Sequence, residues 1–533
     1  MLPLKINKMK IFKVLILLFL IHSNTLAQTL TSPTLEMQQK IIERKVVFYS
    51  DFGAVGDGKT DDIEAIVAAH AFANKHNLSV QANDAATYYI GGKSKTAIIQ
   101  TNTNFGKASF IIDDTNVESR GSFVFLVSSN LKPIKLKGIQ SLKKNQTKIE
   151  TSLPASCLIT VTNANVKRYI RFGANQNSGS SQTDIFKVDK NGIVDMNAPI
   201  IWDFDEITDI SALPIDENII TITGGRFTTI ANQVQTDDKY FSRGFSIKRS
   251  NVIFSGMEHY ITGEGEFGAP YNGFLNIKDC YSVTFRNMIL TGHKVYQFAK
   301  NGYSALSKGT YDIAPSRAIN LSFINCRQSN DINDKTYWGI IGSNFCKNIV
   351  LDSCTFSRFD AHQGVANATI KNSTLGYQGI NAIGFGNLTI ENTTNYANNF
   401  VNLRSDYGST WQGKLIIRNC TFIPDNGKSP GVNLIGGSNG GQHDFGYDCY
   451  LPEQIIIDNL KIEDANFSAN YNGAAIFANF NPKMLNETFQ ETFPYIRNTT
   501  VVLKNIQTKS GKKLRVSDNT YMFKDVIIKN ETK

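Results

Sequence analysis

The segment SRFDAHQGV, residues 357–365, contains an acid and an imidazole at the spacing of a β-strand. Asp360 and His362 are two residues apart, and Phe359 and Ala361 alternate with them. Successive side chains of a strand point to opposite faces, so a strand here places the carboxylate and the imidazole on the same side. Two such groups can hold, accept or donate a proton, as general acid–base chemistry requires. The segment therefore predicts a chemically active outer face.

Three further tetrapeptides resemble FDAH (359–362) and predict a stack of similar strands. They are INAI (380–383), VNLR (401–404) and VNLI (432–435). Their first and third residues are apolar and would face a core. If all four segments stack in register, their second residues form one outward column, namely Asp360, Asn381, Asn402 and Asn433. Such amides can bind hydroxyl groups, but asparagines also bond to one another along stacked strands, so a purely structural row is the alternative.

The fourth residue of each tetrapeptide belongs to a second outward column. It contains His362 and, two strands further on, Arg404. Neighbouring strands are ~4.8 Å apart, so the two Cα atoms should be roughly 10 Å apart, a gap that a guanidinium can largely span. The face should then present an acid, an imidazole, a guanidinium and amides, which together suit the binding of hydroxyls and carboxylates.

Two loops that follow these strands add polar and aromatic residues. We expect the segments 404–411 and 436–450 to fold over the same face, because loops on one side of a repetitive fold often form its binding surface. Their candidate residues are Asp406, Tyr407, Trp411, His443, Asp444 and Tyr447. The aromatic residues Trp338, Tyr407 and Trp411 either stack on sugar rings or pack in the core or at its rim.

Two reactions fit these residues. The first is β-elimination on a uronic-acid polymer, in which Arg404 or the asparagine row neutralises the substrate carboxylate. His362 or His443 would take the C5 proton, and Tyr447 or Tyr407 would protonate the leaving oxygen.

The second reaction is hydrolysis of a glycosidic bond, which usually needs two carboxyl groups. Their separation is ~5–5.5 Å in retaining enzymes and ~6.5–9.5 Å in inverting ones. Asp360 and Asp444 are the best pair, with Asp406 in reserve. Arg404 and the positive balance of the chain, +9 in total and +5 without the four lysines of the leader, place elimination on an acidic polymer first.

A recurring phrase indicates the elements that position these residues. Alternating β-branched or aromatic residues are followed by Asn or Ser in VTFRN, LSFIN, IVLDS, ATIKN, LTIEN, LIIRN, IIIDN and VVLKN, which end at residues 287, 325, 353, 372, 392, 419, 459 and 505. The shortest spacings are near 20 residues, and the links within a repeat are too short for a crossover helix. Short parallel strands without intervening helices predict an all-β fold, a right-handed parallel β-helix.

The segment DFGAVGDGKTDDIEAI, residues 51–66, resembles the N-terminal signature of the pectate-lyase-like superfamily, of the rhamnogalacturonase and epimerase type. This resemblance implies the same β-helix and a secreted carbohydrate-active protein. The helical spacing after Asp61 predicts a helix that closes the end of the stack, with Asp61 and Glu64 as a capping box. The NTD and GHG phrases of the polygalacturonase-type hydrolases do not occur, so the resemblance assigns no catalytic residue.

The chain divides into a leader and one large domain. Lysines, a short apolar run and Ala27 predict a signal peptide over residues 1–27, so the protein should be periplasmic or extracellular. Residues 45–533 should form the β-helix, and about 120–215, which lack the repeated phrase, a β-rich insertion. Within it, FKVDKNGIVD (186–195) predicts a hairpin with an Asn-Gly turn.

Composition limits the partners. The seven cysteines are predicted to be free core thiols, and neither a phosphate-binding loop nor zinc-ligand spacing occurs, so no metal and no cofactor are expected. We expect a monomer that binds a polysaccharide or oligosaccharide substrate, without nucleic acid and without stable membrane insertion. A non-catalytic glycan-binding or adhesin-like β-helix is the remaining alternative.

Overall fold

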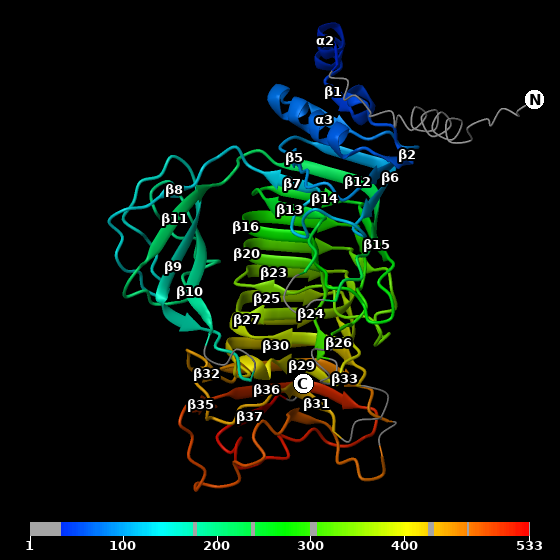
Figure 1. Ribbon diagram of the computed structural model, residues 1–533. Coiled ribbons are helices and arrows are strands. Elements are labelled where there is room, and N and C mark those ends of the chain that lie inside the picture. The colour runs from blue at the N-terminus through cyan, green and yellow to red at the C-terminus, as the bar shows by residue number, and fades with distance from the viewer. Residues whose placement is uncertain are drawn as a thin grey trace, which may run out of the picture.

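The protein is built on one long sheet of parallel strands. The computed structural model describes residues 33–173, 178–235, 240–298, 306–424, 431–465 and 468–531. A single sheet contains 29 of the described strands. Figure 1 shows them stacked as a rod, with the N-terminal helices at one end and the C-terminal coils at the other. The predicted fold class, a right-handed parallel β-helix, is confirmed, whereas the predicted leader lies outside the described residues.

The recurring phrases form one face of the β-helix. Its strands are β14 (Val252–Ser255), β16 (Asn272–Arg286), β20 (Tyr311–Ile324), β23 (Lys347–Asp352), β25 (Val365–Lys371), β27 (Gly384–Glu391), β30 (Trp411–Phe422), β33 (Gln454–Ile462), β36 (Thr500–Thr508) and β37 (Ile527–Asn530). The first residues of all eight phrases stand opposite one another, from Val283 through Leu321 to Val501. The register predicted from the repeats is therefore confirmed.

The polar residue that ends each phrase turns the chain at a corner of the coil. All eight of these residues have a left-handed backbone, with φ between 48° and 57°. Asparagine tolerates this conformation better than other residues with a side chain. The amides also bond from coil to coil, as Asn325 does to Asn287 (2.7 Å) and Asn459 to Asn419 (2.9 Å). The asparagine of the phrase is thus both a turn residue and a rung of a ladder.

A second face carries the chemically interesting strands. It contains β7 (Phe125–Ser128), β13 (Phe245–Lys248), β22 (Ser343–Asn344), β24 (Thr355–Gln363), β26 (Thr374–Ala382), β29 (Asn399–Leu403), β31 (Asn433–Gly436) and β34 (Ala475–Phe477), together with parts of β16 and β20. Asp360 pairs with Asn381, which pairs with Asn402. The first three tetrapeptides are therefore in the predicted register, and Phe359 and Ala361 are buried in the core.

The fourth tetrapeptide is displaced from its predicted register by three residues. Asn433 pairs with Asn399, and Asn402 pairs with Gly436. Val432 was predicted to lie beside Val401 and to face the core. Ile435 occupies that position instead. Both registers put an aliphatic side chain in the core, so hydrophobic periodicity alone did not distinguish them.

The remaining face and the first coils complete the rod. The third face contains the second half of β12 (Ile220–Ile230), whose first half pairs with β14, together with β15 (Glu258–Thr262), β17 (Ile289–Leu290), β21 (Arg327–Gln328) and β28 (Thr394–Asn395). The first coils use β1 (Val46–Phe48), β2 (Asp57–Asp61), β3 (Ser79–Gln81), β4 (Thr87–Ile90), β5 (Ala97–Ile99) and β6 (Thr103–Asp113). Stacked rings, such as Phe254 on Phe285 (centroids 5.1 Å apart) and Phe285 on Phe323 (4.9 Å), continue through the core.

Helices close the N-terminal end. α3 (Ile63–His76) lies against the first coils, and α2 (Leu35–Arg44) lies beyond it (Figure 1). The predicted capping box is wrong, because Asp62 is the N-cap and Glu64 pairs with Lys93. The Asp62 carboxylate instead accepts hydrogen bonds from the backbone of residues 55 and 56, so it stabilises the glycine-rich turn before the helix.

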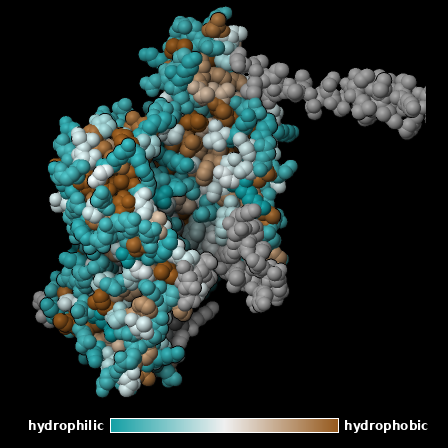
Figure 2. All heavy atoms as spheres, turned by 60° about the vertical axis from the view of Figure 1, so that its left-hand side comes forward, coloured by the Kyte–Doolittle hydropathy of each residue, from teal (hydrophilic) through white to brown (hydrophobic). Residues whose placement is uncertain are grey.

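A separate antiparallel sheet occupies the interval in which an insertion was expected. It consists of β8 (Ile134–Lys135), β9 (Cys157–Arg168), β10 (Ser180–Val188) and β11 (Asp209–Pro214) and has its own apolar core. The predicted hairpin follows β10, with Val188 opposite Val194 and Gly192 at φ 79°. Figure 1 shows this sheet beside the rod, and Figure 2, which turns it forward, shows a mainly hydrophilic face with scattered apolar side chains.

A buried ion pair fastens this sheet to the rod. The Lys347 Nζ on β23 lies 2.7 Å from an Asp184 carboxylate oxygen on β10, and both side chains are 1% exposed. Burial alone would lower the pKa of Lys347 and does so here, although Asp184 opposes the shift.

All seven cysteines are buried and free, as predicted. Of the helices in the described ranges, none has the length and apolar character that a membrane span requires.

Candidate functional site

Asp360 lies at the centre of a charged cluster on the second face. Its carboxylate accepts hydrogen bonds from Arg358 (2.7 Å), from Arg404 (2.9 Å) and from the Tyr311 hydroxyl (3.2 Å). The ring of Tyr311 reaches Asp360 by crossing Gly342, which has no side chain to block it. Burial alone would raise the pKa of Asp360, but the two guanidinium groups hold it below its usual value. Asp360 is therefore ionised and enclosed.

Arg404 joins Asp360 to a second carboxylate. One guanidinium nitrogen contacts Asp360, and the other two contact Asp406 at 3.2 and 2.8 Å. Burial would lower the pKa of Arg404, but these two carboxylates raise it above its usual value. Asp406 also pairs with Arg171 (3.1 Å), whose side chain is 44% exposed. The predicted meeting of Asp360 and Arg404 is thus present in the structure.

We call Asp360, Asp406, Arg171, Arg358 and Arg404 the charged cluster. Its three guanidinium groups and two carboxylates leave an excess of one positive charge. Of the three cations, Arg171 is the most exposed, because the side chains of Arg358 and Arg404 are 7% and 12% exposed. The cluster therefore presents one guanidinium group to solvent.

His362 lies at the edge of the charged cluster and is partly exposed. Its Nδ1 is 3.1 Å from the side-chain oxygen of Asn344, and its ring meets Tyr407 edge-on with centroids 5.4 Å apart. Because the amide oxygen accepts a hydrogen bond, Nδ1 carries the hydrogen and Nε2 keeps its lone pair. Burial, helped by the charge of Arg404, lowers the pKa of His362 to about 4. The imidazole is therefore neutral at pH 7 and able to accept a proton.

The asparagine column is divided between structure and surface. Asn402 donates to Asn381 (2.7 Å), and Asn381 donates to the backbone of Gln378. Asn402 and Asn433 both line a groove of about 330 Å³, in which Asn399 also lies. The predicted bonding between stacked asparagines is therefore present in one pair, Asn402 and Asn381. The groove is lined by the amides of Asn399, Asn402 and Asn433, which remain accessible.

The other predicted residues lie in a different place. His443, Asp444 and Tyr447 line a cavity of about 590 Å³ between the antiparallel sheet and the coils, which we call the cleft. Residues 168–172 separate the cleft from the charged cluster: Ile170 bonds to the backbone of Phe445, and Phe172 bonds to that of Asp406. The expectation of a single site containing all five catalytic candidates is therefore wrong, because a segment of the insertion lies between the two groups.

Several predicted aromatic roles are also wrong. Trp411 is fully buried and donates to the backbone of Gly386, so it packs in the core. Tyr407 is 3% exposed, and the Tyr447 hydroxyl donates to the backbone oxygen of Tyr407, so neither is placed as an acid for a leaving group. Trp338 is partly exposed, with the guanidinium carbon of Arg358 5.0 Å from its ring centre.

Four residues of the site were missed from the sequence, and one of them is Asn344, the partner of His362 Nδ1. Arg358 is two residues before Asp360 in the same strand. The alternation that puts Asp360 and His362 on one face therefore puts Arg358 there too. Tyr311 and Arg171 come from a distant coil and from the insertion, and no local pattern marks them.

Comparisons with known proteins identify the architecture. No family model and no curated protein sequence matches this chain. The tailspike gp61 of Pseudomonas phage phi297 is similar in structure, with a TM-score of 0.54, 12% identity, and coverage of 89% of this chain and 83% of its own. At this identity, the likeness concerns the fold alone.

Two further tailspikes are less similar. The gp54 tailspike of Acinetobacter baumannii bacteriophage AP22, solved with a capsular saccharide, has a TM-score of 0.47 and 11% identity over 92% of this chain and 77% of its own. The gp49 tailspike of Pseudomonas phage LKA1 has a TM-score of 0.46 and 13% identity over 90% and 84%. Neither carries an argument about function.

Proposed function

We propose that this protein is an exported enzyme that cleaves an acidic, uronate-containing polysaccharide by β-elimination beside the charged cluster. The observation that carries the proposal is a neutral imidazole, His362, held next to an excess of positive charge. The resemblance of residues 51–66 to the pectate-lyase-like superfamily supports a carbohydrate substrate. Membership of that superfamily, like export by residues 1–27, is part of the proposal.

The proposed reaction uses one proton acceptor and one exposed cation. Arg171 binds the uronate carboxylate, and His362 Nε2 takes the C5 proton. The electron pair of the C5–H bond forms the C4–C5 double bond while the C4–O bond breaks, and the leaving oxygen takes a proton from water. The guanidinium group stabilises the negative charge that develops on the carboxylate as the proton leaves.

Charge supports elimination over hydrolysis at this place. A hydrolase needs two carboxyl groups that reach the substrate. Asp360 is fully buried, and both Asp360 and Asp406 are each contacted by two guanidinium groups. Asp444, the other member of the predicted pair, lines the cleft instead. The charged cluster therefore positions residues and binds anions, whereas His362 performs the proton transfer.

The test is incubation with pectic, alginate, glycosaminoglycan and neutral polysaccharides. The absorbance of unsaturated uronate and the number of reducing ends are followed together. We expect both to rise with at least one acidic polymer. Reducing ends without the absorbance would indicate hydrolysis, and binding without either signal would indicate a non-catalytic glycan-binding protein; both results contradict the proposal.

A further inference from the structure

The cleft has the composition of a carbohydrate-binding site distinct from the charged cluster. Its aromatic lining comes from four parts of the chain and consists of Trp202, Phe385, Phe445, Tyr447, Tyr450 and Phe493. Phe493 is 41% exposed, and Tyr450 is partly exposed. Aromatic faces next to hydrogen-bonding groups are typical of sites that bind sugar rings, which have both apolar faces and hydroxyl groups.

One wall of the cleft is held firmly in place. Arg168 donates to the side chain of Gln182 (2.9 Å) and to the backbone oxygen of Gly446, and its guanidinium carbon lies 4.7 Å from the centre of the Trp202 ring. Trp202 in turn meets Phe385 edge-on, with centroids 4.9 Å apart. Arg168 thus ties the antiparallel sheet to loop 443–446, so the aromatic wall is formed before any ligand binds.

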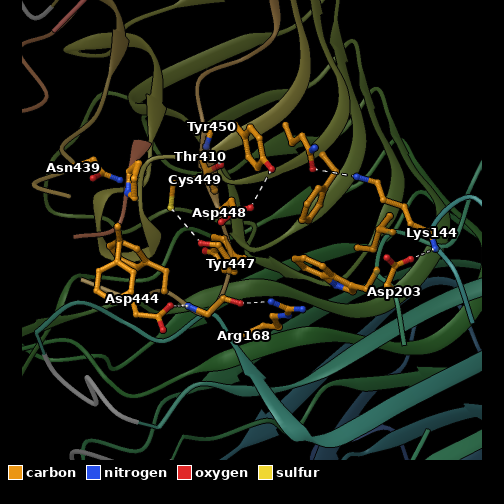
Figure 3. A pocket seen from close by; sticks show the side chains of 18 of the residues that line it. Lys144, Arg168, Asp203, Thr410, Asn439, Asp444, Tyr447, Asp448, Cys449 and Tyr450 are labelled. Carbon is orange, nitrogen blue, oxygen red and sulfur yellow. Dashed lines mark hydrogen bonds between the residues drawn. The ribbon is translucent and has the colours of Figure 1, made fainter. Parts of the chain in front are cut away.

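The charge of the cleft is opposite to that of the charged cluster. Asp203, Asp205, Asp444 and Asp448 face the lining cations Lys144 and Arg168, and Lys143 pairs with Asp205 (2.7 Å). Apart from His443, this leaves an excess of one negative charge. Figure 3 shows Asp444, Asp448 and Asp203 spread along the cleft. Such a site repels uronate carboxylates.

Two of these carboxylates are available to a ligand. Among the residues that the structure describes, Asp444 accepts only a backbone bond from its own loop, from Gly446 N at 2.7 Å, and Asp448 is 3.5 Å from the Tyr450 hydroxyl. Both side chains are exposed, and neither forms an ion pair with a residue in the described ranges. Carboxylates in this condition accept strong hydrogen bonds from sugar hydroxyls.

We propose that the cleft is a second glycan-binding site, which takes a neutral oligosaccharide segment without carboxylate groups and carries out no chemistry. Tyr450 and Phe493 would stack on sugar rings, and Asp444 and Asp448 would accept hydrogen bonds from their hydroxyls. The site is independent of the elimination chemistry, because residues 168–172 separate it from His362.

Binding is tested with neutral glucan, galactan and mannan oligosaccharides by titration calorimetry, so that failure of the elimination chemistry does not affect the result. We expect the wild-type protein to bind at least one of them, and Tyr450→Ala and Phe493→Ala each to weaken that binding about tenfold. Phe267→Ala is the matched control, because Phe267 is 51% exposed and lies outside the cleft. Unchanged affinity in both cleft variants, or no binding to any neutral probe, overturns the proposal.

A charge variant tests the chemical class of the ligand. Replacing Asp444 and Asp448 together by asparagine should weaken binding of the neutral oligosaccharide and reduce discrimination against a polyuronate of equal length. Loss of polysaccharide cleavage in this double variant would assign the chemistry to the cleft and contradict the proposal.

Discussion

At the scale of single residues, the proposed reaction gives the residues of the second face two different roles, positioning and proton transfer. Asp360 is buried and accepts hydrogen bonds from two guanidinium groups and a hydroxyl, so in the proposal it positions Arg404 and does not contact the substrate. Removing one partner of a buried ion pair leaves an uncompensated charge and is strongly destabilising. Variants of Asp360 would thus mix loss of fold with loss of activity, and the accessible residues give cleaner tests.

The pH dependence of the reaction follows from His362. An imidazole acts as a base only when unprotonated, and the pKa of His362 is lowered to about 4. We expect kcat/KM to remain high down to about pH 5 and to fall about tenfold per pH unit below the pKa. An acid limb near the ordinary imidazole value of about 6.5 would contradict the assignment of His362 as the base.

Arg171 should determine the affinity for acidic substrate. Its exposed guanidinium is the cation that a uronate can reach, and a charge-assisted hydrogen bond contributes about 1.5–3 kcal/mol. Arg171→Ala should therefore raise KM at least about tenfold for an acidic polymer. Arg226→Ala is the control, because Arg226 is 61% exposed and paired with Glu258 outside the site. Equal kinetics in the two variants would remove Arg171 from the site.

At the scale of elements, the corner asparagines link backbone geometry to packing between coils. Asn372 has φ 52°, donates to Asp352 (2.9 Å) and accepts from Asn392 (3.1 Å). This corner thus contributes both a conformational preference and two hydrogen bonds.

Substitution of Asn372 separates these contributions. Asn372→Ala loses both, because alanine bears the full cost of the left-handed conformation, roughly 1–2 kcal/mol, without the local hydrogen bonds of the asparagine side chain. Asn372→Gly loses only the hydrogen bonds and should be the less destabilised variant. The midpoints of urea-induced unfolding measure the order, and a glycine variant as unstable as the alanine variant would contradict this account.

The buried Lys347–Asp184 pair should hold the antiparallel sheet against the rod. Lys347→Ala leaves Asp184 buried without a cation, which should cost about 3–5 kcal/mol and expose the sheet to protease. Lys135→Ala is the control, since Lys135 and its partner Asp209 are 63% and 51% exposed and such pairs contribute about 0–1 kcal/mol. Equal rates of limited proteolysis in the two variants would show that the pair does not fasten the sheet.

The strands also show why the sequence predicted some parts of the site and not others. The eight phrases predicted their register correctly, because the asparagine corner marks each coil at a constant place. The tetrapeptides have no residue of this kind at a constant place, and β31 buries an aliphatic side chain equally well in the shifted register. Arg358 could have been found by strand parity, whereas Arg171 depends on the docking of an insertion whose position no periodicity encodes.

At the scale of the whole molecule, two surfaces of opposite charge lie on either side of residues 168–172. The charged cluster has an excess of positive charge, and the cleft has an excess of negative charge. A heteropolysaccharide with acidic and neutral residues could contact both. The insertion therefore contributes to both proposed sites, with Arg171 in one and Arg168 in the other.

The central claim is that His362 removes a proton from a uronate beside the charged cluster. The most direct measurement is the formation of unsaturated uronate from an acidic polymer by wild-type protein and by His362→Ala, with the circular dichroism and unfolding midpoint of both recorded. We predict that the variant keeps its fold and loses the absorbance signal. Full activity in a folded His362→Ala variant would contradict the account.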